Sequence, residues 1–191
     1  MQEKKNLYFI AIIPAQETGD EITRFKKDFA DRFESKKALK VMPHITLKAP
    51  FKLPVSEHSK LKQWFQKLFI NVEPFEMELK GFGAFRNKNS RVVFVQPVMK
   101  TQLYSLQREI IRSFSLFYLH EPIMDLEIKY APHITVAYRD LDPEKFRQAW
   151  KEYQEKKYIA TFWVNDFHLL QHNGTEWKII STYSLRGSRL N

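Results

Sequence analysis

The chain has 191 residues, and its 31 lysines and arginines outnumber its 22 aspartates and glutamates, which gives a formal net charge of +9. A hydrophobic content of 43%, with 15% aromatic residues, predicts a folded globular protein and excludes an intrinsically disordered chain. The absence of cysteine excludes disulfide bonds and thiolate chemistry. The positive charge favours a polyanionic partner such as RNA or a phosphate ester, although solvated helix faces would explain it equally well.

The apolar run nearest the N-terminus, Leu7–Ile13, is too short to span a membrane and lacks the small-residue cleavage site of a secretory signal. We therefore expect a soluble, cytoplasmic protein that does not associate with membranes. We also expect it to be a monomer.

The first elements predicted are a strand, a helix and a second strand. Leu7–Ile13 is a continuous apolar run, which is typical of a buried central strand. Apolar residues at helical spacing follow over 22–33, and Lys26 falls on the opposite face of that helix, where we expect solvent. The second strand begins at His44, and we expect Pro50 to end it.

Further helices and strands are predicted through the rest of the chain. In chain order they are a helix at 56–69, a strand from 75, a turn at 86–90, a strand at 91–96, a helix at 101–117, an unassigned loop at 118–131, a strand at 133–138, a helix capped by Asp142, a strand at 159–170 and, after an Asn173-Gly174 hairpin turn, a strand at 177–185.

One five-residue motif occurs twice. Pro43-His44-Ile45-Thr46-Leu47 opens the second strand, and Pro132-His133-Ile134-Thr135-Val136 opens a later one, so the histidines are 89 residues apart (133 − 44). The same order of strands and helices surrounds both motifs, over about 6–85 and again over about 91–172. We therefore expect residues 1–191 to form a single domain with an internal duplication. The predicted fold is α+β, with two pseudo-twofold-related lobes of antiparallel sheet and helices around a central cleft.

The duplicated motif predicts a catalytic site. Side chains of a strand alternate between its faces, so His44 and Thr46 point the same way, and so do His133 and Thr135. Two imidazoles on opposite sides of a phosphodiester can act as general base and general acid, because histidine titrates near neutral pH. The threonine hydroxyls can hold the non-bridging phosphate oxygens between them. The sequence leaves open which histidine is the acid and which is the base.

Four further residues are candidates for substrate binding. Lys48 falls on the same strand face as His44 and could add positive charge near the phosphate. The second strand has Ala137 at the equivalent place, and Arg139 is two residues further along the same face. Phe9 and Phe85 could each stack a nucleobase, although aromatic residues at such positions are as often part of a core.

A metal site is not expected, because no carboxylate or further histidine stands at ligand spacing near either motif. The other four histidines lack a comparable pattern and are expected at the surface: His58, His120, His168 and His172.

The paired motifs, with the first strand and the Gly81-Phe82-Gly83-Ala84-Phe85 segment, resemble the 2H phosphoesterase superfamily, and within it the LigT-like or 2′-5′ RNA ligase family. The resemblance implies a bilobal fold and hydrolysis of the 2′,3′-cyclic phosphate ends of RNA or nucleotides without a metal or another cofactor. It implies a phosphomonoester product, which in many members is the 2′-phosphate, and it allows a 2′-5′ RNA ligase activity.

Two other functions fit the same residues. One is a module that binds RNA ends or nucleotides without turnover. The other is a phosphodiesterase that acts on 2′-5′ linkages or on small cyclic phosphates, including the ADP-ribose cyclic phosphate used by related members.

Overall fold

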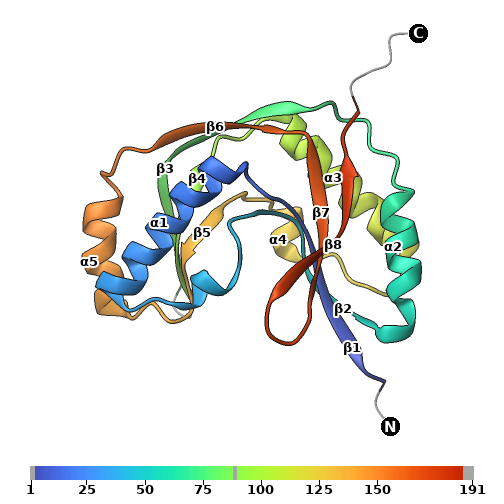
Figure 1. Ribbon diagram of the computed structural model, residues 1–191, viewed down its shortest axis with the longest axis horizontal. Coiled ribbons are helices and arrows are strands. Elements are labelled where there is room, and N and C mark those ends of the chain that lie inside the picture. Colours follow the sequence, from blue (N-terminus) through green and yellow to red (C-terminus); the bar gives the residue numbers. More distant parts are fainter. Residues whose placement is uncertain (1–2, 88–89, 187–191) are drawn as a thin grey trace.

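The computed structural model describes residues 3–87 and 90–186. Two four-stranded antiparallel sheets form the fold (Figure 1). The first sheet has the strand order β2-β1-β7-β8 and consists of β1 (Lys5–Ile12), β2 (Ile45–Pro54), β7 (Asp166–His172) and β8 (Trp177–Ser184). The second sheet has the order β5-β4-β3-β6 and consists of β3 (Phe75–Asn87), β4 (Ser90–Pro97), β5 (Ile134–Ala137) and β6 (Ile159–Val164). The predicted α+β fold with two lobes is confirmed.

Each long helix follows a strand of one sheet and packs on the other sheet. Helix α1 (Gln16–Phe33) follows β1 and packs on β5, whereas α3 (Thr101–Phe117) follows β4 and packs on β2. Helix α2 (His58–Gln66) joins α3 on the first sheet, and α5 (Pro143–Tyr153) joins α1 on the second. The short helices are η1 (Lys37–Lys40), η2 (Val55–Glu57) and α4 (Asp125–Ile128).

One extended segment of the chain passes directly from the second sheet to the first. The strand expected as one element at 159–170 is two, because the chain leaves the second sheet after β6 and enters the first sheet as β7 at Asp166. The long strand β3 stays in the second sheet, between β4 and β6. It pairs with β6 over Phe75–Lys80 and with β4 at Leu79 and from Phe82 onward. The register with β4 shifts around Gly81, whose φ of 67° is in the left-handed region that glycine favours.

Strand β2 is longer than the sequence predicts. Pro50 does not end it, and the strand continues to Pro54. Because β2 lies at the edge of its sheet and pairs only with β1, a residue without an N–H can point outward without breaking the ladder. By contrast, the helix at 101–117 and the Asp142 cap are confirmed, the Asp142 carboxylate accepting a hydrogen bond from the Glu144 N–H at 2.8 Å.

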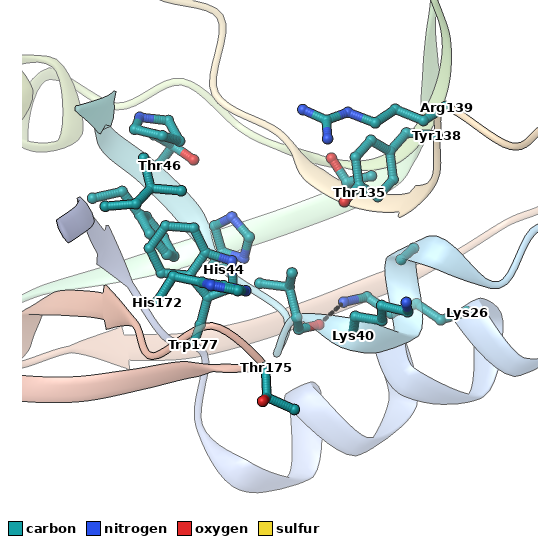
Figure 2. Close-up of a pocket in the computed structure, with 15 residues that line it drawn as sticks. Lys26, Lys40, His44, Thr46, Thr135, Tyr138, Arg139, His172, Thr175 and Trp177 are labelled. Atoms are coloured by element: carbon teal, nitrogen blue, oxygen red, sulfur yellow. Dashed lines mark hydrogen bonds between the residues drawn. The ribbon is translucent and has the colours of Figure 1, made fainter. Parts of the chain in front are cut away.

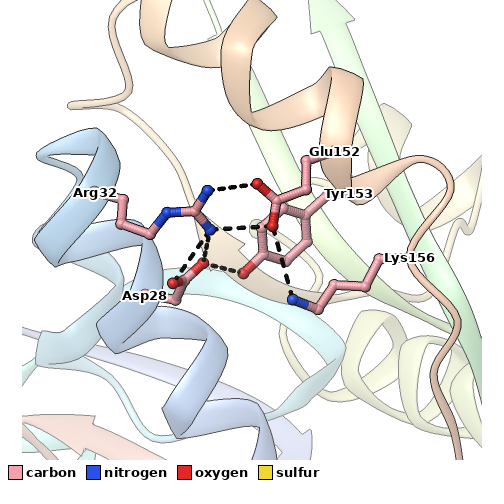
Figure 3. A network of polar contacts seen from close by, with 5 residues as sticks. All are labelled: Asp28, Arg32, Glu152, Tyr153 and Lys156. Atoms are coloured by element: carbon pink, nitrogen blue, oxygen red, sulfur yellow. Dashed lines mark hydrogen bonds and ion pairs between the residues drawn. The ribbon is translucent and has the colours of Figure 1, made fainter.

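Helices α1 and α5 are joined by a polar network (Figure 3). The Arg32 guanidinium on α1 contacts Asp28 on the same helix and Glu152 on α5. The Tyr153 hydroxyl of α5 donates a hydrogen bond of 2.6 Å to Asp28. Most of these groups are partly exposed, so the network fixes the geometry of α1 against α5 more than it adds stability.

Within the described ranges, the structure contains no helix that has the length and apolarity needed to cross a membrane.

Candidate active site

A cavity of about 380 Å³ lies between the two motif-bearing strands (Figure 2). Its size is at the lower end of the range for small-ligand pockets, which suits a ligand about as large as one nucleotide. It is lined by Leu7, Phe9, Lys26, Ala38, Lys40, Val41, His44, Thr46, Pro50, Thr135, Tyr138, Arg139, His172, Thr175 and Trp177. Both lobes contribute to it, with β2 on one side and β5 and the residues after it on the other.

His44 precedes β2 and is held by its own backbone. Its Nδ1 lies 2.8 Å from the Met42 carbonyl oxygen, which can only accept a hydrogen bond, so Nδ1 carries the proton and Nε2 is left for a ligand. The ring of Phe9 packs against the imidazole with 4.9 Å between centroids. The pKa of His44 is lowered to about 4, mainly by burial and also by the charges of Lys26 and His133, against the opposing effect of the Met42 hydrogen bond.

His133 has the same local arrangement before β5. Its Nδ1 donates to the Ala131 carbonyl oxygen at 2.8 Å, again leaving Nε2 free. Burial lowers its pKa, although the Ala131 hydrogen bond acts in the opposite direction. His133 is not among the described residues that line the cavity, although its charge contributes to the lowered pKa of His44.

Aromatic rings support the imidazole of His133 as well. Phe85 stands perpendicular to it at 5.1 Å between centroids, and Phe94 lies at 5.4 Å. Gly83 makes room for this packing, because a Cβ there would come within 2.4 Å of the Phe94 ring. Phe85 therefore lies against a predicted catalytic histidine and outside the cavity, whereas Phe9 is part of the cavity wall. A base-stacking role for either ring stays a prediction.

Thr46 and Thr135 are both half-buried and both line the cavity, one from each strand. Figure 2 shows them on opposite sides of it. For Thr46 this placement agrees with the alternation of side chains expected after His44, which also lines the cavity, whereas Thr135 lines it without His133.

The predicted role of Lys48 in substrate binding is wrong. A register shift between β1 and β2, where Ile10 pairs with Lys48 and Ala11 with Thr46, inserts an extra residue and turns Lys48 away from the face of His44. Its side chain is 3% exposed, and its Nζ lies 2.7 Å from Oε1 of Glu127 in α4. The lysine is therefore part of a buried ion pair in the fold.

Arg139 reaches the cavity by a different route from the one predicted. Strand β5 ends at Ala137, so Arg139 is not on its face, and its backbone has the left-handed φ of 57°. The next residue, Asp140, accepts hydrogen bonds from Ser35 Oγ and from the backbone N–H groups of Lys36 and Lys37. Although burial alone would raise the pKa of Asp140, these hydrogen bonds lower it. They hold the segment after β5 against the start of η1, where Lys40 also lines the cavity.

Lys26 was predicted to face solvent, and this is wrong. It is 3% exposed, it lines the cavity, and its Nζ donates to the Val41 carbonyl oxygen at 2.7 Å. Burial lowers its pKa to about 8. Amphipathic periodicity assigns one apolar face to a helix, but α1 is covered both by the second sheet and by η1, so part of its polar face is also inside.

The hairpin between β7 and β8 supplies cavity residues that the sequence did not single out. His172 and Trp177, paired across the two strands, pack with 5.1 Å between ring centroids, and Thr175 lies at the tip. His172 was expected at the surface, so that prediction is wrong. The Asn173-Gly174 turn signal predicted the hairpin itself but not its position beside His44.

Of the other histidines expected at the surface, only His120 is exposed. His168 is buried and contacts Thr182 and Asp166, and the half-buried His58 contacts the Tyr8 hydroxyl. In the part of the chain that the structure describes, no group of three or more histidine, aspartate or glutamate side chains could hold a metal ion.

Curated relatives cover almost the whole chain. The protein named "Putative phosphoesterase SH1944" from Staphylococcus haemolyticus (strain JCSC1435) is 25% identical over 178 residues, which is 92% of this chain and 97% of that protein. The protein named "Putative phosphoesterase OB1230" from Oceanobacillus iheyensis is 26% identical over 182 residues, covering 93% and 97%.

Solved structures share the fold. Escherichia coli LigT complexed with 3′-AMP has a TM-score of 0.66 at 15% identity, covering 96% of this chain and 100% of that one. The Thermus thermophilus protein TT0787 has a TM-score of 0.65 at 17% identity, covering 95% and 98%. Residues 14–176 match the family described as the 2′-5′ RNA ligase superfamily. The chain therefore belongs to the 2′-5′ RNA ligase superfamily, the group of 2H phosphoesterases that its paired motifs resemble.

Proposed function

We propose that the protein is a metal-independent phosphodiesterase that hydrolyses 2′,3′-cyclic phosphate ends of RNA or of nucleotides to a phosphomonoester. One observation carries the proposal. Two imidazoles from different lobes, His44 and His133, each donate Nδ1–H to a backbone carbonyl and keep Nε2 free, and the charge of His133 contributes to the lowered pKa of His44. A matched pair of imidazoles with free Nε2 atoms supports a general base and a general acid acting on one phosphorus atom.

The reaction needs one neutral and one protonated imidazole. The Nε2 lone pair of one takes a proton from water while the water oxygen forms a bond to phosphorus. The bond from phosphorus to the 3′-oxygen breaks, and Nε2–H of the other imidazole gives its proton to that oxygen, which leaves the 2′-phosphate. Because the pKa of both histidines is lowered in the free protein, the negative charge of the bound phosphate must help to keep one of them protonated.

Two further cavity residues would bind the reacting phosphate and stabilise its negative charge. Thr46 and Thr135 would donate hydrogen bonds to the non-bridging oxygens and so fix the phosphorus between the imidazoles. A nucleotide as ligand is supported by the basic character of the cavity and by the related fold of LigT, which has been solved with 3′-AMP.

The test is turnover of adenosine 2′,3′-cyclic phosphate and of a short RNA ending in a 2′,3′-cyclic phosphate, both in excess chelator. His44→Ala and His133→Ala are each expected to lower kcat by about 10²–10⁴-fold, the usual contribution of a general acid or base. His120→Ala is the matched control, because that histidine is exposed. Phosphorus NMR of the product distinguishes the 2′-phosphate from the 3′-phosphate.

The other functions give different results in the same assay. A wild-type protein that binds the RNA and leaves its cyclic phosphate intact is a binding module. Cleavage of 2′-5′-linked dinucleotides alone, or of small cyclic phosphates but not RNA, assigns the enzyme to those substrates. Hydrolysis that persists unchanged in both histidine variants contradicts the proposed mechanism.

A further inference from the structure

The cavity has two unlike walls. Trp177 and His172 lie on one side of His44, and Lys26, Lys40 and Arg139 lie on the other (Figure 2). The first wall offers rings, which can contact a nucleobase or a sugar. The second offers three cations that come from three separate elements: α1, η1 and the segment after β5.

Carboxylates lie near the cationic wall but outside the cavity, since Asp20 and Glu176 line a neighbouring cavity that Lys26 and Lys40 also line. The described residues that line the cavity include no aspartate and no glutamate, and none of the three cations forms an ion pair with a described carboxylate. Lys26 is the most unusual of them, because a lysine that is only 3% exposed normally has a charged partner. Its one hydrogen bond within the protein, to the Val41 carbonyl oxygen, leaves two of its three N–H donors for a ligand.

The charge of the cavity exceeds what the reacting group needs. A 2′,3′-cyclic phosphate is a diester with a single negative charge, whereas the three cations together carry three positive charges. We propose that Lys26, Lys40 and Arg139 form a subsite for a second phosphate of the substrate, one that is not broken in the reaction. This inference rests on the proposed function for the identity of the first phosphate, and it specifies a substrate class: nucleotides that carry a further phosphate on the same nucleoside.

The structure fixes the backbone segments that carry this subsite. The Asp140 carboxylate bonds to Ser35 Oγ and to the N–H groups of Lys36 and Lys37, so the segment that carries Arg139 is fastened to the start of the helix that carries Lys40. The Arg32 network between α1 and α5 fixes the helix that carries Lys26. Because the backbone and the buried side chain of Lys26 are already fixed, only the exposed side chains of Lys40 and Arg139 need to become ordered when an anion binds.

Binding of two product analogues tests the inference without any turnover. Adenosine 2′-phosphate and adenosine 2′,5′-bisphosphate are titrated into the whole protein by calorimetry at one pH and one salt concentration. The bisphosphate is expected to bind at least about tenfold more tightly, as one additional charge-assisted contact would give. Equal affinities for the two nucleotides in the wild-type protein overturn the inference, whether or not the protein hydrolyses cyclic phosphates.

Variants show whether these three residues create the preference. Lys40→Gln, Arg139→Asn and Lys26→Met are each expected to reduce the affinity ratio severalfold, while binding of the monophosphate changes little. Asparagine is chosen at 139 because it tolerates the left-handed backbone there. Lys37→Gln and Lys27→Met, at exposed positions next to the subsite, are the matched controls. If a variant weakens binding of the monophosphate and of the bisphosphate equally, the cations contact the reacting phosphate instead. If the affinity ratio falls as much in the control variants, the preference comes from unspecific electrostatic attraction. Either result overturns the subsite.

A turnover comparison identifies the source of the second phosphate. Adenosine 2′,3′-cyclic phosphate is compared with its 5′-phosphorylated form and with a dinucleotide that ends in the cyclic phosphate. A higher kcat/KM for the 5′-phosphorylated nucleotide that depends on Lys40 and Arg139 assigns the subsite to a terminal 5′-phosphate. A higher kcat/KM for the dinucleotide that depends on the same residues assigns it to the RNA backbone. If the plain cyclic nucleotide is hydrolysed and neither addition helps, the inference fails while the proposed function stands.

Discussion

The two His-x-Thr strands are alike at the histidine and different beyond it. In each, the imidazole donates Nδ1–H to the carbonyl two residues earlier at 2.8 Å and packs against a phenylalanine, Phe9 beside His44 and Phe85 beside His133. Strand β2 then continues for ten residues, whereas β5 has four. The motif therefore determines how each imidazole is held, and the rest of each strand determines what surrounds it.

The cation nearest to each motif shows this difference. Lys48 in β2 is turned inward by a bulge and paired with Glu127, so that its charge belongs to the core. Arg139 after β5 has a left-handed backbone and lines the cavity. Two copies of one motif have in this way produced a site with an apolar side and a cationic side, which a symmetric pair of strands would not have.

The largest expected effect comes from breaking the ion pair that distinguishes β2. Glu127 accepts hydrogen bonds from Lys48 Nζ at 2.7 Å, from the Ala49 N–H at 3.0 Å and from the Met124 N–H at 2.9 Å. Glu127→Gln leaves a buried ammonium without its counter-charge, so the free energy of unfolding should fall by about 3–5 kcal/mol in urea denaturation. Asp125→Asn, an exposed position on the same short helix, is the control.

A double variant sharpens that result. Lys48→Met combined with Glu127→Leu removes both charges and should recover part of the lost stability, because a buried pair can often be replaced by apolar side chains. A Glu127→Gln protein as stable as wild type would show that the pair is not desolvated as the structure indicates.

The threonines test whether the two strands contribute equally to binding. Thr46→Val and Thr135→Val keep the side-chain shape and remove the hydroxyl, so each should lower kcat/KM by about 10- to 100-fold, the value of one hydrogen bond to a charged group. Thermal unfolding should change little, since both side chains are only half-buried. Loss of activity in one variant alone would indicate that only the threonine of that strand donates a hydrogen bond to the phosphate.

The lowered pKa values of the two histidines predict that activity is highest at acidic pH. The pKa of His44 is lowered to about 4, and the pKa of His133 is also below its ordinary value near 6.5. Above both pKa values the form with one proton on the pair becomes rarer by about tenfold per pH unit, so kcat/KM should fall by that factor from about pH 6.5 to 7.5. This range lies below the pKa of Lys26, about 8, so most of the lysine stays protonated and its titration adds little to the fall. A flat or rising profile there would contradict the lowered pKa values.

The smallest expected effect concerns the rings behind the imidazoles. Phe9→Leu and Phe85→Leu keep an apolar neighbour and remove only the aromatic contact, which is worth about 0.5–1.5 kcal/mol. Both should lower kcat severalfold through a less well held histidine. Only Phe9→Leu should also weaken nucleotide binding, because Phe9 lines the cavity and Phe85 does not. Equal changes in KM for the two variants would contradict the different roles of Phe9 and Phe85 in nucleotide binding.

The sequence was sufficient wherever short-range patterns decide the outcome. Strand alternation predicted that His44 and Thr46 share a face, and both line the cavity, whereas of the second pair Thr135 lines it and His133 does not. An aspartate before a proline marked the start of α5. It was not sufficient for Lys48, because a β-bulge depends on the register with a partner strand, which no residue of β2 encodes by itself.

Lys26 and Trp177 were missed for a related reason. The amphipathic pattern of α1 identifies the face that packs on a sheet, but not the second face that η1 covers. The hairpin of β7 and β8 was predicted locally, yet its neighbour β1 lies at the other end of the chain, and only the assembled sheet brings Trp177 to His44.

The strand arrangement has a consequence for how the chain can be divided. The first half supplies β1 and β2 to one sheet and sends β3 to the other, and the second half sends β7 back beside β1. A cut between β3 and β4 would therefore leave β3 without either of its partners and β1 without β7 in the first fragment, and β4 without β3 and β7 without β1 in the second, so both fragments would have strand edges open to aggregation. The two fragments are expected to become active only when they are refolded together, each completing the other's sheet.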